Sequence, residues 1–173
     1  VFHEIDWPNY DGVQLEYLER HLRIMSAFYG VLNPSTCIKP YRLDMTARLG
    51  ALNLYTHWQC YVDRVFCQED IIVNLASKEY SRMLMRNKYV GEVIDIDFKE
   101  EQSDGQLKIV TVHAKQARGL MTHYMVNHLI EEVELLKHFG EAGYQFEPKL
   151  SHESLFTFVR PYGWNLNYEN FEL

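Results

Sequence analysis

The stretch His21–Met45, HLRIMSAFYGVLNPSTCIKPYRLDM, concentrates more specialised residues than any other part of the chain. It combines an apolar pattern with a glycine, two prolines and several charged side chains. Apolar residues at spacings of three and four predict an amphipathic helix over Leu15–Phe28, with Gly30 as its stop. After a turn, Pro40 favours extended backbone, and apolar and charged side chains alternate over Tyr41–Met45.

The composition is that of a globular protein. The chain has 173 residues, of which 47% are apolar and 24% charged, which is the size and mixture of one domain with a real core. No apolar run approaches the roughly 18 residues of a membrane span. Charged side chains such as Glu4 and Asp6 stand where a signal peptide needs apolar residues. We therefore expect a single domain over residues 1–173 and no membrane partner.

Cysteine content and net charge limit the cellular locations and the classes of binding partner that the sequence allows. The three cysteines form no CxxC pair, which favours a reducing, cytoplasmic location over a secreted disulfide framework. The net charge of −7 argues against non-specific nucleic-acid binding by the whole surface. A local basic cleft remains compatible with this charge, because net charge does not say where the charges lie. The oligomeric state stays open.

The rest of the chain alternates helical and strand patterns. The expected helices are Asn53–Phe66, a turn from Ser77 to about Met85, Lys115–Leu129 and Glu131–Phe139. The expected strands are Ile71–Ala76, Glu92–Phe98, Leu107–His113, Tyr144–Phe146 and Leu155–Arg160. Ser103–Gly105 is a turn signal that joins the second and third of these strands into a hairpin. Together they predict an α+β fold, in which helices cover a mixed sheet.

The first group of candidate site residues lies in the opening stretch. Arg23 and Arg42 could bind a phosphate, with His21 and Asp44 orienting them. The alternative is structural, because an ion pair between Asp44 and either arginine would pin the loop to the helix.

The second group is Lys115 and Arg118, in the segment AKQARG. Two cations in the first turn of a helix oppose its macrodipole, which a sequence tolerates when an anion binds there. Gly119 is costly inside a helix and indicates a close approach by a ligand or another backbone. The alternative is that the helix starts elsewhere, which would leave two solvated cations.

The third group, Asn74, Ser77 and Glu79, lies at the end of a predicted buried strand, where ligands collect in open α/β sheets. Ser77 and Glu79 could act as nucleophile and base, although Ser77 as a helix N-cap is the simpler interpretation. No nucleotide-binding or hydrolase fingerprint occurs. The eight histidines are scattered, and His57 with Cys60 shows no further ligands, so we expect no metal and no cofactor.

The His21–Met45 stretch resembles the HLR-xxSG-xYG-xL-xP-xD-xxxPYRLEM signature of the peroxide stress response YaaA family. Further blocks follow in the family's order: Leu54–Trp58 resembles DLYxFW, Ile72–Tyr80 resembles INLASxEY, Lys115–Met121 resembles KKARGLM, and Gly143–Phe146 resembles GYxF. The match runs from about Tyr10 to Arg160. Several ordered blocks are far more specific than any one of them.

The resemblance implies a cytoplasmic, mostly bacterial protein that protects cells against hydrogen peroxide by restraining free iron and DNA damage. Family members bind DNA through an element of their N-terminal part, which would precede Val1, so we expect the chain to lack that part. The implied site is a basic cleft for DNA or a phosphate-bearing ligand, lined by Arg23, Arg42, Lys115 and Arg118 and supported by His21, Asp44, Asn74, Ser77 and Glu79. The alternative is an enzyme acting on a nucleotide-like or phosphorylated small molecule, with Asp44, Ser77 or Glu79 as acid or base.

The chain departs from the family pattern in several places. Ala27 replaces a glycine, Asp44 replaces a glutamate, and Thr36 replaces an aspartate of the central loop, which removes a carboxylate. The family's connection into the His21 stretch is longer, so we expect a segment to be missing near Gln14–Leu15.

Overall fold

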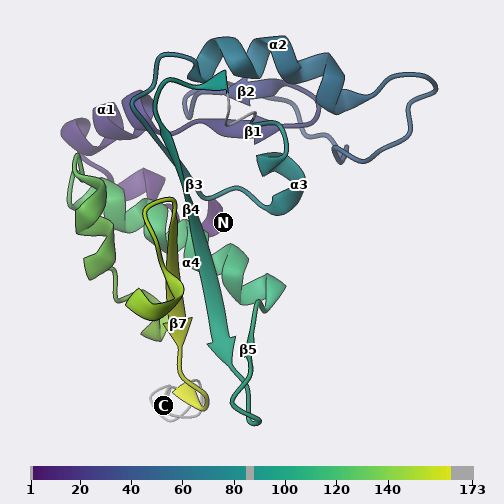
Figure 1. Cartoon of the computed structure of the whole chain (residues 1–173). Coiled ribbons are helices and arrows are strands. Elements are labelled where there is room, and N and C mark those ends of the chain that lie inside the picture. The colour runs from purple at the N-terminus through teal and green to yellow at the C-terminus, as the bar shows by residue number, and fades with distance from the viewer. Residues whose placement is uncertain (1, 85–87, 165–173) are drawn as a thin grey trace. The chain divides into compact units, whose positions relative to one another are not determined.

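The computed structural model describes residues 2–84 and 88–164, and its helices and mixed sheet form an α+β fold, as predicted (Figure 1). The chain divides into two compact units. Asp11–Val93 form the first, called here the loop unit, and residues 1–10 with 94–173 form the second, called the sheet unit. That residues 1–173 act as a single domain stays a prediction.

Helix α1 of the loop unit spans Gly12–His21 and is fixed at its start by a capping box. The Asp11 side chain accepts the Gln14 backbone N–H at 2.9 Å, and the Gln14 side chain accepts the Asp11 N–H at 3.0 Å. These bonds satisfy N–H groups that a helix start leaves without partners. The helix begins before the predicted Leu15 and runs unbroken through Gln14–Leu15, so the expectation of a missing segment there is wrong.

The helix predicted over Leu15–Phe28 is wrong in its second half. After α1 the chain forms an antiparallel hairpin of β1, Ile24–Ser26, and β2, Gly30–Leu32. Gly30 has a φ of 82°, and a Cβ atom there would stand 2.8 Å from the Trp58 ring. Only glycine fits this position, so contact with a residue distant in sequence overrides the local helical spacing.

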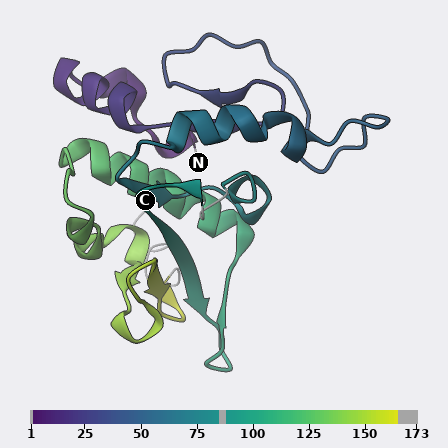
Figure 2. The ribbon, with the colours of Figure 1, turned by 45° about the horizontal axis from the view of Figure 1, so that its top comes forward.

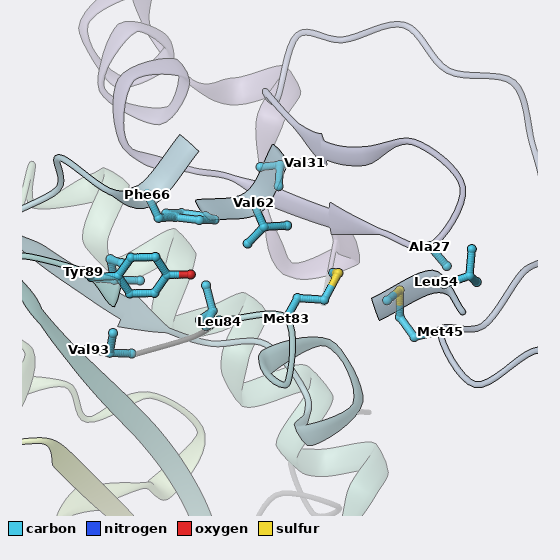
Figure 3. Close-up of a cluster of buried hydrophobic side chains, with 11 residues drawn as sticks. Ala27, Val31, Met45, Leu54, Val62, Phe66, Met83, Leu84, Tyr89 and Val93 are labelled. Atoms are coloured by element: carbon cyan, nitrogen blue, oxygen red, sulfur yellow. The ribbon is translucent and has the colours of Figure 1, made fainter. Parts of the chain in front are cut away.

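Helix α2 spans Leu54–Phe66, as predicted, with Asn53 as its N-cap. Trp58 Nε1 donates to the Ala27 carbonyl at 2.9 Å, which ties α2 to the hairpin. Tyr61, predicted on the inner face, is exposed. Figure 3 shows the hydrophobic core of the loop unit, whose buried members are Ala27, Val31, Met45, Leu54, Val62, Phe66, Ile72, Met83, Leu84, Tyr89 and Val93. Each large apolar side chain in it contributes roughly 1.5–3 kcal/mol.

The polar residues expected at the end of a strand do lie there: Asn74 is the last residue of the strand, and Ser77 and Glu79 follow it. Strand β3 spans Ile71–Asn74 and is shorter than predicted, and helix α3 spans Lys78–Ser81. Ser77 occupies the N-cap of α3, but its side chain makes no capping hydrogen bond. The predicted end of this turn near Met85 lies outside the described residues.

The sheet unit contains the mixed sheet. Strand β4, Glu92–Glu101, begins at the end of the loop unit, and in the sheet unit it pairs in parallel with β7, Leu155–Arg160. Strand β5, Leu107–Lys108, pairs antiparallel with β4, and β6, Gln145–Phe146, pairs antiparallel with β7. The hairpin predicted across Ser103–Gly105 is confirmed, with a shorter second strand.

Helix α4 spans Thr111–Asn127 and lies alongside β4 (Figure 2). It therefore begins and ends earlier than the predicted Lys115–Leu129. The segment predicted as the helix Glu131–Phe139 contains instead the 3₁₀ helix η4, Val133–His138. The other 3₁₀ helices of this unit are η1 Phe2–Glu4, η2 Trp7–Asn9, η5 Glu141–Gly143 and η6 Pro148–Leu150.

Aromatic rings fill the core of the sheet unit. The ring centroid of Phe98 in β4 lies 5.9 Å from Phe139, 5.1 Å from Tyr144 and 5.6 Å from Phe158, separations at which aromatic pairs attract. Within residues 2–84 and 88–164, no helix is long and apolar enough to cross a membrane.

Candidate functional site

Arg23 and His21 are engaged at the end of α1. Arg23 Nη1 donates to the carbonyls of Glu19 and Leu22, both at 2.9 Å, which satisfies backbone acceptors that the helix end leaves open. The His21 ring packs on Tyr17 with centroids 4.4 Å apart. Both residues therefore have a structural task, and their predicted role at a phosphate stays a prediction.

Asp44 forms no ion pair with either arginine among the described residues, so the alternative in which Asp44 pins the loop through such a pair is wrong. The loop is held by other means. Glu79 Oε1 accepts the Met45 N–H at 2.8 Å, and the hydroxyl of Tyr55 donates to the Glu79 carbonyl at 3.0 Å. Asp44 itself remains exposed.

Ser26 organises the aromatic side of this loop. Its buried Oγ accepts backbone N–H groups from Phe28 at 3.3 Å and Tyr29 at 2.9 Å and is hydrogen-bonded to the Tyr41 hydroxyl. Because two N–H groups occupy its lone pairs, Ser26 donates to Tyr41. The Tyr41 ring in turn lies 5.4 Å from Phe28 and 5.5 Å from Tyr29. We call Phe28, Tyr29 and Tyr41 the aromatic trio.

Tyr80 collects the polar groups of the same region. Burial raises the pKa of its phenol, and the nearby Tyr41, Glu79, Asp44 and Tyr55 raise it further. The phenol therefore keeps its proton in a setting rich in oxygen atoms. Tyr41, Asp44, Glu79 and Tyr80 therefore come together within the loop unit. Of these, the sequence offered only Asp44 and Glu79 as candidates.

Asn74 and Ser77 are placed less favourably for chemistry. The Asn74 side chain accepts the Ala76 N–H at 3.1 Å, which shapes the turn after β3. Ser77 follows at the start of α3. Asn74 therefore shapes the turn, and its role in a site stays a prediction. In the part of the chain that the structure describes, no base is hydrogen-bonded to the Ser77 hydroxyl.

Exposed cations lie on both sides of Tyr41 in the same loop. Lys39, Arg42 and Arg48 are all exposed, and among residues 2–84 and 88–164 none of them has an acidic partner within ion-pair distance. The guanidinium of a further cation, Arg82, lies 4.6 Å from the centre of the Tyr55 ring. In the described part of the chain, these three exposed cations are therefore not held in ion pairs.

Lys115 and Arg118 belong to the sheet unit. Because α4 begins at Thr111, they do not lie in its first turn, so the predicted anion site at free N–H groups beside them is wrong. Lys115 is exposed, whereas the Nε of Arg118 is buried without a hydrogen-bond partner. Burial lowers the pKa of Arg118, and the nearby Asp97 opposes that shift. That these two cations line one cleft with Arg23 and Arg42 stays a prediction.

The sheet unit also holds a charged cluster that sequence reasoning missed. Glu100 Oε1 is 2.9 Å from each of Arg160 Nη2, His113 Nδ1 and the Tyr144 hydroxyl. Burial acts to raise the pKa of Glu100, but the hydrogen bonds from Arg160, Tyr144 and His113 and the Arg160 charge together lower it. Burial and the bond to Glu100 raise the pKa of Tyr144.

A signal for this cluster existed in the strand patterns. Arg160 continues the alternation of the buried Phe156 and Phe158, and Glu100 continues that of Phe98. The alternation therefore predicts that each charged side chain lies on the apolar side of its strand. Glu100 and Arg160 are also register partners in the parallel ladder, which single strands could not reveal.

Metal ligands do not gather in the described residues. Within residues 2–84 and 88–164, no group of three or more His, Cys, Asp or Glu side chains could hold a metal ion.

The chain resembles known proteins over most of its length. The sequence model of the family described as peroxide stress protein YaaA matches residues 1–150. A UPF0246 protein of Rickettsia felis is 40% identical over 166 residues, and one of Francisella tularensis subsp. novicida is 37% identical over 168 residues. In both cases the match covers 92% of this chain and 66% of the relative, so the chain spans just under two thirds of these relatives' length. The chain therefore belongs to the peroxide stress protein YaaA family.

Proposed function

We propose that this chain serves the peroxide stress response in the cytoplasm by binding DNA or another phosphate-bearing ligand, and that this binding limits DNA damage driven by free iron. Membership in the family supports the stress role. The observation that carries the binding is the exposed set Lys39, Arg42 and Arg48 in the loop unit, which lacks acidic partners among the described residues.

Exposed cations of this kind suit a phosphate backbone. Arginine binds phosphate oxygens with two parallel hydrogen bonds, and each phosphate contact releases condensed counterions. The whole chain carries a net charge of −7, so attraction of a polyanion requires such a local concentration of positive charge.

The aromatic trio adds a second kind of contact beside the cations. Phe28 is 54% exposed and Tyr41 is 38% exposed, and both rings are held by the contacts around Ser26. Aromatic faces next to a cationic strip are the arrangement on which unpaired bases stack. Duplex DNA with a local bulge offers both the phosphates and such bases.

The other predicted cations differ in how well they could contact a phosphate. Arg23 already uses Nη1 for two backbone carbonyls, so we assign it a positioning role. Lys115 is exposed and able to contact a phosphate. Arg118, with a buried Nε that no partner meets in the described chain, is the less accessible of the two.

The test is a titration of fluorescent duplex and bulged DNA at 50 and 200 mM salt. We expect the affinity of the full chain to fall steeply with salt, as counterion release requires. Replacing Arg42 by Ala should weaken binding about fivefold and lower the salt slope by about one.

The matched control is Lys149→Ala, which removes one exposed cation of the sheet unit and so changes the net charge equally. If both variants weaken binding to the same extent, the effect is one of net charge, and the proposed contact at Arg42 is wrong. The iron part has its own readout, because Arg42→Ala should also lose any protection of plasmid DNA against nicking by iron and peroxide.

A second function is favoured by the surroundings of Tyr80. A protonated phenol near Asp44 could transfer a proton while the exposed Arg42 of the same loop unit holds a phosphate, as an enzyme on a phosphorylated small molecule requires. Asp44 is the better candidate base, because Glu79 is already bonded to the Met45 N–H. Product formation from nucleotides or sugar phosphates, lost in both Tyr80→Phe and Asp44→Asn, would support this function over simple binding.

A further inference from the structure

The sheet unit has a pocket of about 370 Å³ that the proposed function does not use. Three segments form it: the end of β4 at Glu100–Gln102, the start of α4 at Val110 and His113, and the end of β7 with the following Arg160–Trp164. All three belong to the same compact unit. The pocket is therefore a feature of one folded body.

The charged side chains that line this pocket have hydrogen-bond donors and acceptors that no described residue uses. Glu100 receives all of its bonds on Oε1, and Arg160 uses only Nη2. Glu100 Oε2 and the Nε and Nη1 groups of Arg160 make no hydrogen bond to any residue within 2–84 and 88–164. The side chain of Arg160 is only 5% exposed and that of Glu100 only 13%. Nearly buried charged groups with open donors and acceptors are costly unless a ligand or water meets them.

The guanidinium is also held rigidly. Its carbon lies 4.9 Å from the centre of the Tyr144 ring and 5.2 Å from that of Trp164, so aromatic rings and the Glu100 carboxylate fix its plane. Trp164 reaches this position because Gly143, at a φ of 76°, has no Cβ: an added one would stand 2.1 Å from the indole nitrogen. Groups fixed before binding lose little entropy when a ligand arrives.

The rim and walls favour a flat ring. Tyr162 and Trp164 both line the pocket, and Tyr162 is 61% exposed although it is a large aromatic residue. Such a face is suited to stacking. The Glu101 carboxylate, which accepts the Tyr162 N–H at 3.3 Å, stands beside it.

The charge of the lining excludes a simple anion site. Glu100 and Glu101 carry two negative charges against one positive charge on Arg160, and a protonated His113 would only bring the sum to zero. Phosphate and carboxylate groups therefore gain little here. A neutral ring with N–H donors for the carboxylates and an acceptor for the arginine fits the lining better.

We propose that this pocket binds a guanine ring, edge-on to the Glu100–Arg160 pair and stacked against Tyr162 and Trp164. The N1–H and N2–H groups of guanine meet carboxylate oxygens, while O6 meets the open N–H groups of Arg160. Adenine and cytosine each lack this order of two donors and one acceptor. The ring can come from a free nucleoside or from an unpaired guanine in single-stranded nucleic acid. Aromatic side chains of proteins stack on such unpaired bases.

The experiment titrates the full chain with guanosine, adenosine and cytidine and follows tryptophan fluorescence, together with calorimetry. We expect guanosine to bind at least about tenfold more tightly than the other two, with little dependence on salt because the nucleoside is neutral. Tyr162→Ala should weaken guanosine about tenfold by loss of stacking. The control Phe2→Ala, which removes a comparably exposed ring of the same unit, should not.

Each result decides the proposal. Equal binding of the three nucleosides, or guanosine binding that survives Tyr162→Ala, overturns it. A guanine-containing single-stranded oligonucleotide serves as the second source: its binding, lost in Tyr162→Ala while free guanosine fails to bind, assigns the ring to nucleic acid. Absence of binding by both sources at millimolar concentration overturns the site. Arg42→Ala should leave guanosine binding unchanged, so failure of the DNA proposal and failure of this one are distinguishable.

Discussion

The two units place their charges in opposite ways. In the loop unit, Lys39, Arg42 and Arg48 are exposed without acidic partners in the described chain, and the loop is fixed by hydrogen bonds to its backbone. In the sheet unit, Arg160 is nearly buried and faces Glu100 at 2.9 Å. Exposed cations cost little in folding and are free to bind a polyanion, whereas a buried pair must be satisfied by its own neighbours.

This difference predicts where substitutions destabilise the protein and where they affect only binding. Removing a charge from the loop should leave the fold intact. Removing a charge from the nearly buried cluster should be costly, because the partner charge is left uncompensated while it is still largely removed from water.

The largest effect is expected for Arg160→Met. The substitution leaves the Glu100 carboxylate nearly buried without its cation, which should lower the free energy of unfolding by about 3–5 kcal/mol. Urea unfolding followed by circular dichroism measures the loss. Arg42→Ala, on the exposed loop, should change stability by no more than about 0.5 kcal/mol.

The double variant Glu100→Met/Arg160→Met isolates the cause. Replacing both charges together removes the desolvation cost, so the double variant should be more stable than Arg160→Met alone. Equal losses in Arg160→Met and Arg42→Ala would erase the distinction between the two regions.

A second large effect concerns the glycines that permit close packing. In Gly30→Ala, the new Cβ would lie 2.8 Å from Trp58 at a φ of 82°, whereas in Gly105→Ala, at a φ of 76°, it would meet nothing within 4 Å. Backbone strain alone should cost about 1–2 kcal/mol in each, and the collision should add about 1–3 kcal/mol at Gly30. Unfolding of both variants under the same conditions gives the difference. Similar losses would mean that Trp58 moves aside.

The buried cluster also predicts a dependence on pH. Because the pKa of Glu100 is lowered in the folded protein, its contribution to stability is present above the ordinary pKa of the carboxylate near 4.5 and is lost as pH falls through the folded value. Glu100→Gln should therefore lose less stability than the parent between pH 5 and pH 2. Unfolding curves across that range test the sign, and a parallel decline in both chains would contradict it.

Strands β3 to β7, helix α2 and the turn at Ser103–Gly105 were predictable because each follows a local pattern. The alternation in Leu155–Arg160 gives β7, and Asn53 marks the start of α2. The β1–β2 hairpin, which replaces the second half of the helix predicted over Leu15–Phe28, was not predictable. Gly30 and Trp58 are distant in sequence and meet only in the folded unit.

The site could be predicted only in outline. The sequence grouped Asp44 and Glu79 in one site, and in the loop unit both lie near the Tyr80 phenol. Tyr41 lies there too, although the sequence did not single it out. The Glu100–Arg160 pair could not be predicted, because the pairing of β4 with β7 that brings the two charges together is not visible in either strand alone. Boundary errors at α4 misled the argument about Lys115, because helix starts depend on a few backbone bonds.

The smallest effect is expected at the Ser26–Tyr41 contact, which belongs to the loop and yet is partly buried. Tyr41→Phe removes the acceptor for the Ser26 hydroxyl and should lower the free energy of unfolding by about 1 kcal/mol. Tyr162→Phe, on an exposed ring, should cost no more than about 0.5 kcal/mol. If Tyr41→Phe costs as little, Ser26 does not fix the aromatic trio. In that case the rings rotate freely in the unbound protein. They would then become ordered only when a base binds, and the loop unit would not present a surface that is already fixed before binding.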